Sequence, residues 1–172
     1  MTYRTHVAGA LAAGFGTIAL TSIPSLDLHI DTGYQQLFIF ALSIAGGLFP
    51  DIDLQTSTIG KNMRHISRLI NKLFGHRNLF HAPILYIAIH IALITYFPAY
   101  KIYVTAWSVG VASHLLLDML NPTGIPLFYP ISKKYRLAKI RTSGEGENFI
   151  YFCLGIANGY LISQSIQTLL QK

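Results

Sequence analysis

Residues 102–120 read IYVTAWSVGVASHLLLDML, an apolar stretch with one histidine and one aspartate near its end. A membrane-spanning helix needs roughly 20 predominantly apolar residues, with a range of about 17–25. His114 and Asp118 are four positions apart, so a helix places both side chains on the same face. Ionisable groups within membrane segments are costly and are functional candidates by default. The stretch therefore predicts an embedded helix with a polar site near one end.

Four further apolar segments accompany this one, at 7–23, 34–49, 82–100 and 149–162. Each is short enough to be either a membrane span or a buried helix of a soluble bundle. About four residues around 98–101 join the segment at 82–100 to the one at 102–120, which predicts a tight helical hairpin. Small residues such as Gly9, Gly14, Gly46 and Gly47 permit close contacts between helices in lipid. We expect an all-α fold, a single domain over residues 1–172, built as a polytopic membrane bundle of about five spanning or membrane-embedded helices.

The composition favours lipid over water as the main solvent of the surface. The chain has 172 residues, of which 52% are hydrophobic and 12% are charged, about half the charged fraction of an ordinary soluble domain. Its mean hydropathy is +0.44. So few charges cannot coat a soluble globule of this size. The single cysteine, Cys153, cannot form an internal disulfide, so no oxidising compartment is implied.

The basic residues are distributed unevenly among the connecting loops. If all five segments span, 11 of the 13 lysines and arginines fall on one side, and only Lys101 and Lys172 fall on the other. Lysine and arginine concentrate on the cytoplasmic side of membrane proteins, which predicts a cytoplasmic N-terminus and an external C-terminus. A soluble all-α bundle, the alternative, has no reason to sort its charge in this way. The basic loops also lack the interleaved aromatic residues of a nucleic-acid stacking platform, so no nucleic-acid partner is expected.

The first 24 residues also have features of a cleaved signal peptide, because Arg4 precedes an apolar core that ends in small residues. Their glycines, and the lack of a clean cleavage site, favour a retained helix. Cleavage would remove His6 from the group of polar residues described next.

Potential metal-binding side chains gather at the same end of the apolar segments as the basic loops. They include five of the seven acidic residues of the chain, and they are His6, Asp51, Asp53, His76, His81, His114, Asp118, Glu145 and Glu147. Part of this clustering is expected, since polar residues collect in long loops. The His114–Asp118 pair is different because it falls inside an apolar segment. The alternative for that pair is a hydrogen-bonded contact that pins two helices together.

Two loop motifs carry the same chemistry. Asp51 and Asp53 are two positions apart, so an extended segment points both carboxylates the same way, and adjacent carboxylates repel unless a cation or a proton lies between them. The alternative is an aspartate-rich turn. His76 and His81 supply imidazoles, which suit zinc and similar metals, and Arg77 between them can hold a phosphate or carboxylate through two hydrogen bonds. The alternative here is a solvated basic loop before a helix.

These motifs occur together in one order along the chain. They are Thr5-His6, Pro50-Asp51-Ile52-Asp53, His76-Arg77-x3-His81, and Ser113-His114-x3-Asp118 followed by Asn121-Pro122-Thr123-Gly124 and a late glutamate. In this respect the chain resembles the YdjM-like, LexA-regulated family of inner-membrane metal-dependent hydrolases, over roughly residues 2–150. The resemblance implies a metal site more than it implies a substrate. By its spacing to the last helix, Glu147 matches the family's glutamate better than Glu145 does.

We therefore expect a divalent metal centre, with zinc favoured and one or two ions bound. The expected ligands are His6, Asp51, Asp53, His76, His81, His114, Asp118 and Glu147. Asp51, Asp53, Asp118 and Arg77 are the expected catalytic residues, in which Asp53 or Asp118 orients a histidine or acts as a base and Arg77 binds phosphate.

The depth of the site at the inner membrane face predicts hydrolysis of a lipid or amphipathic phosphoester by metal-activated water. The basic run at 133–141 would attract anionic headgroups. One alternative is a metal-ion or proton-coupled transporter, although transport sites usually lie near the middle of the membrane. The other alternative is a non-catalytic membrane protein with a structural metal.

Overall fold

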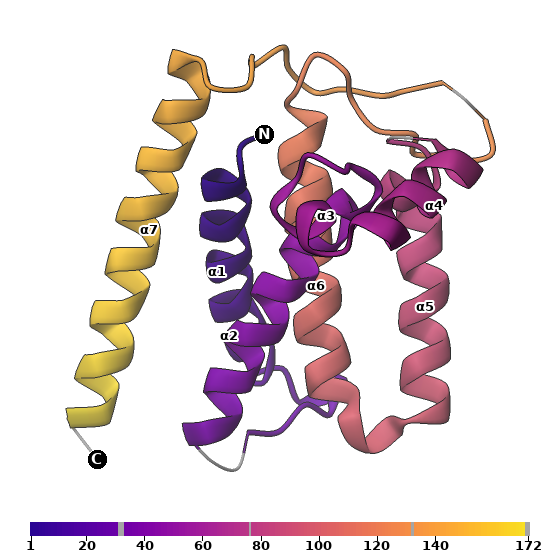
Figure 1. Cartoon of the computed structure of the whole chain (residues 1–172). Coiled ribbons are helices and arrows are strands. Elements are labelled where there is room, and N and C mark those ends of the chain that lie inside the picture. The colour runs from indigo at the N-terminus through magenta and orange to yellow at the C-terminus, as the bar shows by residue number, and fades with distance from the viewer. Residues whose placement is uncertain (31–32, 76, 132, 171–172) are drawn as a thin grey trace.

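The computed structural model describes residues 1–30, 33–75, 77–131 and 133–170, and every regular element in these ranges is helical. The α-helices are joined by short 3-10 turns and irregular segments (Figure 1). The elements are α1 (Tyr3–Leu20), η1 (Pro24–Leu26), α2 (Gly33–Leu48), η2 (Phe49–Asp53), α3 (Thr58–Asn62), α4 (Arg64–Phe74), η3 (Leu79–His81), α5 (Pro83–Tyr96), η4 (Pro98–Tyr100), α6 (Lys101–Met119) and α7 (Glu145–Leu170). The all-α prediction is confirmed, as is the tight hairpin between α5 and α6.

The centre of the fold is a three-helix unit of α1, α2 and α6, which pack closely against one another (Figure 1). Glycine allows α2 and α6 to approach at the level of their backbones. A Cβ atom added to Gly46 would lie 2.1 Å from the Trp107 carbonyl oxygen, and one added to Gly110 would lie 2.0 Å from that of Ser43. The Ser43 hydroxyl donates to the Ala10 carbonyl oxygen at 2.7 Å, which ties α2 to α1. This close packing brings the polar ends of the three helices together.

Adding a single methyl group at Gly110 should therefore destabilise the fold. The Cβ atom of Gly110→Ala would meet the Ser43 backbone, which cannot rotate away, and overpacking of this kind costs about 1–3 kcal/mol. We expect a lower melting temperature for the purified variant in detergent. Gly159→Ala is the matched control, because a Cβ atom there meets nothing within 4 Å. Equal melting temperatures for the two variants would contradict the close α2–α6 contact.

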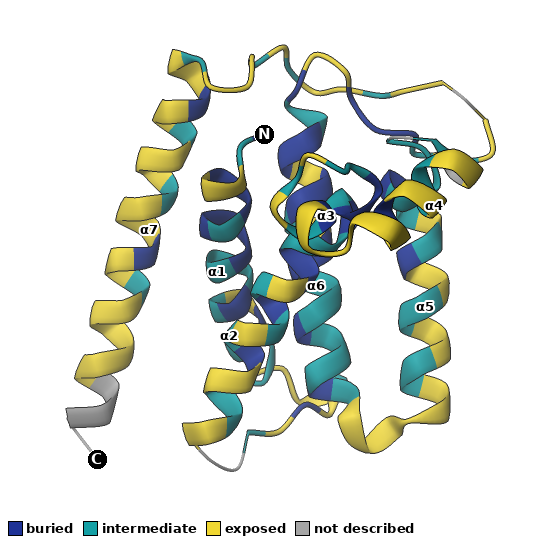
Figure 2. Cartoon of the chain, in the orientation of Figure 1, coloured by how far each residue is buried: buried dark blue, intermediate teal, exposed yellow. Residues whose placement is uncertain are grey.

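Three helical stretches in the described residues are long and apolar enough to cross a membrane, namely Gly33–Asp53, Pro98–Met119 and Glu145–Gln167. The stretch Pro83–Tyr96 is apolar but shorter, and α1 is not among the candidates. Figure 2 shows that much of α7 is exposed along its length, with Phe149 and Phe152 each more than 60% accessible. A long apolar helix this exposed is compatible with a lipid environment. The prediction of about five spans is therefore supported for three of them.

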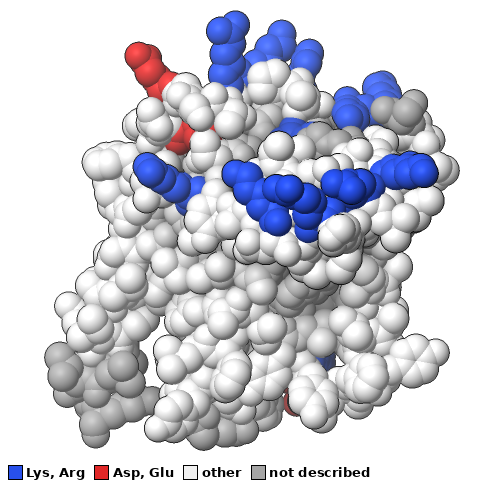
Figure 3. Space-filling model, in the orientation of Figure 1, with Lys and Arg blue, Asp and Glu red and all other residues white. Residues whose placement is uncertain are grey.

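The end of the bundle that holds the N-terminus also holds most of the charge. Figure 3 shows lysine and arginine side chains gathered over this end, where α3 and α4 lie. We expected residues 54–80 to be a basic loop, but α3 and α4 occupy much of this segment. In α4 the apolar Ile66, Leu69 and Leu73 are exposed, and they alternate with basic residues, as in helices that lie at a membrane surface.

Candidate metal centre

The site is built around the last two turns of α6. His114 and Asp118 are fully buried there, on the face that packs against α1 and α2. The His114 Nδ1 atom lies 2.7 Å from the Gly47 carbonyl oxygen. A carbonyl only accepts, so Nδ1 carries the hydrogen and Nε2 keeps its lone pair. The helix contact therefore orients His114 with Nε2 available as a metal ligand.

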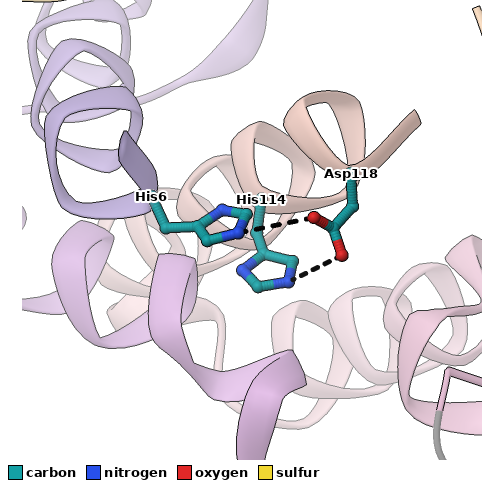
Figure 4. A group of neighbouring side chains, drawn as sticks. All are labelled: His6, His114 and Asp118. Atoms are coloured by element: carbon teal, nitrogen blue, oxygen red, sulfur yellow. Dashed lines mark ion pairs between the residues drawn. The ribbon is translucent and has the colours of Figure 1, made fainter. Parts of the chain in front are cut away.

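The first group of candidate ligands consists of His6, His114 and Asp118. Figure 4 shows both imidazoles directed toward the Asp118 carboxylate, with one ring from α1 and the other from α6. The two rings stack with their centroids 3.8 Å apart. The His6 Nε2 atom is 3.4 Å from Asp118 Oδ1. Neither ring nitrogen of His6 has a hydrogen bond within the described part of the chain, although both are buried.

A second group shares His114 and adds Asp51 and His81. The His114 Nε2 and His81 Nε2 atoms lie 3.8 Å and 3.7 Å from Asp51 Oδ1. His81 Nε2 is also 3.5 Å from Asp118 Oδ2, which joins the two groups. In each group, the ligand atoms lie within 4.8 Å of one another. These five side chains form what we call the His/Asp cluster, and they come from α1, η2, η3 and α6.

The spacing of these atoms fits a small divalent metal ion. Bonds of about 2.0–2.1 Å to a tetrahedral zinc ion place neighbouring ligand atoms roughly 3.3–3.4 Å apart. The cluster distances of 3.4–3.8 Å are at or slightly above this value. Direct hydrogen bonds would instead require about 2.7–3.2 Å. The histidine and aspartate groups are therefore close enough to share a cation, and could do so with a small inward movement.

Asp53 supports the cluster without belonging to either group. Its Oδ2 atom lies 3.3 Å from His81 Nδ1 and accepts a hydrogen bond from the Arg77 backbone N–H at 2.8 Å. The Asn71 side chain donates to the Asp53 carbonyl oxygen at 2.9 Å. A carboxylate on the far nitrogen of an imidazole fixes the tautomer that binds metal through the other nitrogen. The geometry thus fits Asp53 as an orienting residue.

The protonation of His81 reflects this concentration of negative charge. Burial alone would lower the pKa of its imidazole, but the carboxylates of Asp118, Asp51 and Asp53 raise that pKa to about 10. The metal-free imidazole therefore holds a proton at neutral pH. A bound metal ion would take the place of that proton, since only the deprotonated imidazole is a ligand.

Two positively charged groups also contact Asp118. The amino group of Met1 lies 2.7 Å from Oδ1, and the Arg77 guanidinium lies 2.8 Å from Oδ2. Arg77 has a φ of 56°, a conformation uncommon for residues other than glycine. Its guanidinium also contacts the Thr123 hydroxyl. The Arg77 guanidinium thus lies at the cluster, where its contacts are with Asp118 and Thr123.

Replacing Asp53 by asparagine should weaken metal binding while leaving all five cluster side chains in place. Loss of a carboxylate that orients a metal-binding histidine typically reduces metal affinity by about 10–100-fold. We expect a loss in this range for Asp53→Asn, measured by competition with a chromogenic chelator. Asp27→Asn is the control, because Asp27 lies at an exposed turn. An affinity for Asp53→Asn equal to that of the control would show that Asp53 does not orient His81.

Glu147 was an expected metal ligand, but in the structure its carboxylate accepts hydrogen bonds from other residues. This carboxylate is 2% exposed and accepts hydrogen bonds from the Thr5 hydroxyl at 2.8 Å, the Thr2 hydroxyl at 3.0 Å and the Ser143 backbone N–H at 2.6 Å. It also accepts one from the Thr2 backbone N–H. Glu147 thus joins the start of α7 to the start of α1. Neither it nor Glu145 is in the metal-binding groups found among the described residues, and His76 lies outside those residues.

Two groups at the site, the Gly47 carbonyl and the Met1 amino group, were not anticipated from the sequence. Asn121 belongs to the motif quoted after Asp118, although no role was assigned to it, and its side chain donates to Asp118 Oδ1 at 2.8 Å. Asn121 follows Asp118 by three positions, a spacing that places two residues near each other at a helix end. No sequence signal points to the Gly47 carbonyl, because its role depends on how α2 packs against α6.

The fold and the site together define an all-α membrane protein with a buried His/Asp cluster that could hold a metal ion. Sequence comparison assigns the chain to a family of inner membrane proteins. It belongs to the YdjM inner membrane protein family, whose sequence model matches residues 1–171. The resemblance to YdjM-like inner-membrane proteins and the inner-membrane localisation are thereby confirmed, whereas the hydrolase activity and the cytoplasmic orientation of the site stay predictions.

Individual relatives are similar over different parts of the chain. The uncharacterized protein YvsG of Bacillus subtilis is 28% identical over 161 residues, which cover 93% of each chain. The inner membrane protein YdjM of Escherichia coli is 34% identical over 118 residues, covering 62% of this chain and 58% of that protein. The uncharacterized protein ORF4' of Methanothermobacter thermautotrophicus is 44% identical over 55 residues, 31% of this chain and 24% of that protein. No solved structure matches the chain.

Proposed function

We propose that this chain is a membrane-bound, metal-dependent hydrolase that cleaves a lipid or other amphipathic phosphoester at the cytoplasmic membrane face. The observation that supports it best is the pair of ligand groups that share His114. Three buried imidazoles and two carboxylates are more than a structural helix contact requires. His114 and Asp118 alone would be sufficient for a purely structural contact between helices.

The surroundings of each residue indicate its role in the proposed reaction. A divalent metal ion, when bound, would supply Lewis acidity and a lowered water pKa for attack on a phosphoryl group. His6, His81, His114 and Asp118 would hold the ion in the buried part of the cluster. Asp53 orients His81. Arg77, whose guanidinium has five donors in total, balances Asp118 and has further donors for a phosphate oxygen.

Asp51 is the cluster residue best placed to meet a substrate. Its side chain is 22% exposed, whereas that of His114 is completely buried. Asp51 also lines a pocket of about 200 Å³ together with Thr56, Ser57 and Thr58. The Ser57 hydroxyl already donates to the Asp51 carbonyl oxygen at 2.7 Å, which leaves the hydroxyl groups of Thr56 and Thr58 to donate to phosphate oxygens. Asp51 is therefore our candidate for the group that binds metal and faces the reacting water.

The level of the cluster in the bundle favours a substrate at the membrane surface. The cluster residues come from the start of α1, from η2 and η3, and from the last turns of α6, and α1 and α6 have these ends at the charged end of the bundle, where α3 and α4 lie (Figures 1 and 3). Basic side chains over this end attract anionic headgroups, and the exposed apolar residues of α4 suit the boundary between headgroups and acyl chains. A phosphoester near the headgroup level would be within reach of Asp51.

The same proposal includes five spans with a cytoplasmic N-terminus. α1 has 18 residues and is about 27 Å long, close to the roughly 30 Å of the hydrocarbon core, and it packs alongside α2 and α6. Reporter fusions after Lys101 and at the C-terminus should therefore both report the external side. A cytoplasmic C-terminus would contradict this topology and would require an even number of spans.

The activity is tested directly with purified protein in mixed micelles. The protein should hydrolyse at least one member of a panel of phospholipids and lipid phosphomonoesters, lose that activity after chelation, and regain it when a divalent metal is restored. Failure across the panel, together with movement of the metal across vesicle membranes, would replace the hydrolase with a transporter. Failure of both, with retained metal, would indicate a structural metal site.

A further inference from the structure

A groove with no part in the His/Asp cluster runs between α1 and α7. Its volume is about 650 Å³, and its walls include Val7 and Leu11 of α1 with Phe152, Gly155 and Ile156 of α7. This wall is apolar. Because α7 is largely exposed (Figure 2) and is long and apolar enough to cross a membrane, the wall would face lipid acyl chains. The groove is therefore suited to a hydrocarbon chain.

Hydrogen bonds attach α7 to α1 on two levels along this groove. At the charged end, Glu147 accepts from Thr2 and Thr5. Further along, the Asn158 side chain donates to the Ala8 carbonyl oxygen at 3.0 Å. Glu147 and Asn158 are 11 positions apart, which corresponds to about 16 Å of helix. These two attachments hold the helices together without filling the groove beside them.

A second, more polar cavity adjoins the groove at its charged end. Its volume is about 360 Å³, and it is lined by Thr2, Ser143 and Asn148 together with Tyr3, Arg4 and Tyr151, the last three of which also line the groove. Arg4 forms no ion pair with any residue of the described ranges, whereas the Glu147 carboxylate nearby already accepts four hydrogen bonds. The polar cavity thus offers a positive charge and hydroxyl and amide donors.

We propose that these adjoining cavities bind an anionic glycerophospholipid, with its phosphate on Arg4 and one acyl chain in the groove between α1 and α7. Arginine forms strong paired hydrogen bonds with phosphate, and Tyr3 and Tyr151 are of the type enriched at the membrane–water interface. A second copy of the chain is a poorer occupant, because a symmetric contact through this groove would bring two Arg4 side chains together. Binding is independent of the metal centre, since Arg4 and Gly155 belong to neither ligand group.

Native mass spectrometry of the full chain in detergent, titrated with phosphatidylglycerol or phosphatidylcholine, tests this proposal. We expect tighter binding of phosphatidylglycerol and about tenfold weaker binding by Arg4→Gln, the loss expected for one charge-assisted contact. Arg64→Gln makes the same charge change on α4, away from the groove, and should bind like the unmodified chain. If Arg4→Gln and Arg64→Gln lost the same amount of phosphatidylglycerol affinity, the binding would reflect general charge attraction, and the proposal would be overturned.

The acyl-chain half of the site has its own pair of variants. A Cβ atom at Gly155 or at Gly159 meets nothing within 4 Å, so a side chain can be added at either position without a clash at its Cβ atom, but only Gly155 lines the groove. Gly155→Leu should weaken phosphatidylglycerol binding severalfold, and Gly159→Leu should not. Competition by inorganic phosphate with no effect of Gly155→Leu would mean that the cavity binds free phosphate. A change from dimer to monomer caused by Gly155→Leu would mean that a second copy occupies the groove.

Discussion

Replacing His114 by alanine is expected to remove most of the bound metal from the purified protein. His114 is shared by both ligand groups, so its loss leaves neither group complete. Removal of a residue that only orients a metal ligand lowers the metal affinity by about 10–100-fold. Removal of His114, which is itself a candidate ligand, should lower the metal affinity by more than that. Metal content after size-exclusion chromatography, measured by elemental mass spectrometry, gives the result.

A comparison with His65→Ala and a melting curve makes this experiment decisive. His65 lies exposed on α4, so its removal should leave the metal content unchanged. The melting curve of His114→Ala identifies any loss of folded protein, because the variant also loses the bond to the Gly47 carbonyl. His114→Gln, which retains a polar side chain, provides a second test at the same position. Full metal content in folded His114→Ala would assign the His114–Asp118 pair a purely structural role.

Conversion of Asp51 to asparagine should abolish metal-dependent turnover. The neutral amide is a poor metal ligand, and it can neither balance the charge of a cation nor accept a proton from the reacting water. Removal of a group with such a role lowers kcat by a factor on the order of 10²–10⁴. Steady-state kinetics with the best substrate of the phosphoester panel measures the effect.

Asp27→Asn serves as the control for charge, because Asp27 is 81% exposed in its side chain and lies outside the cluster. Its kcat should match that of the unmodified chain. Unchanged kcat in Asp51→Asn would remove Asp51 from the reaction and leave its pocket without a function in hydrolysis.

Much of the site geometry follows from sequence position and topology. The i, i+4 spacing of His114 and Asp118 put both on one helix face, and the structure has them there, buried and directed inward. His6, Asp51 and His81 come from other segments that end at the same side of the bundle. Helix direction therefore explains why the five side chains lie at one end of the bundle.

Other features depend on packing that a single sequence does not encode locally. The backbone contact between Gly110 and Ser43 brings α2 against α6, and only then does the Gly47 carbonyl meet His114. Glu147 was expected at the metal because its spacing to the last helix matches the glutamate of the family that the chain resembles. In the structure the threonines at the start of α1 surround its carboxylate instead, a contact that requires α7 to dock beside α1.

The secondary structure of the segment between α2 and α5 was also not anticipated. Its place between two apolar segments predicted a basic loop, but Ile66, Leu69 and Leu73 recur at helical spacing and form the exposed apolar face of α4. The spacing of the apolar residues in this segment indicates such a helix face when it is considered separately from the basic residues between them.

The central claim, that the His/Asp cluster holds a metal ion, is tested most directly by the metal content of the unmodified chain. The protein would be purified without chelators, dialysed against metal-free buffer and analysed by elemental mass spectrometry, then reconstituted with zinc and measured again. We expect about one or two equivalents of a divalent metal per chain, restored after chelation. A folded protein that contains no divalent metal and takes up none on reconstitution would contradict the claim.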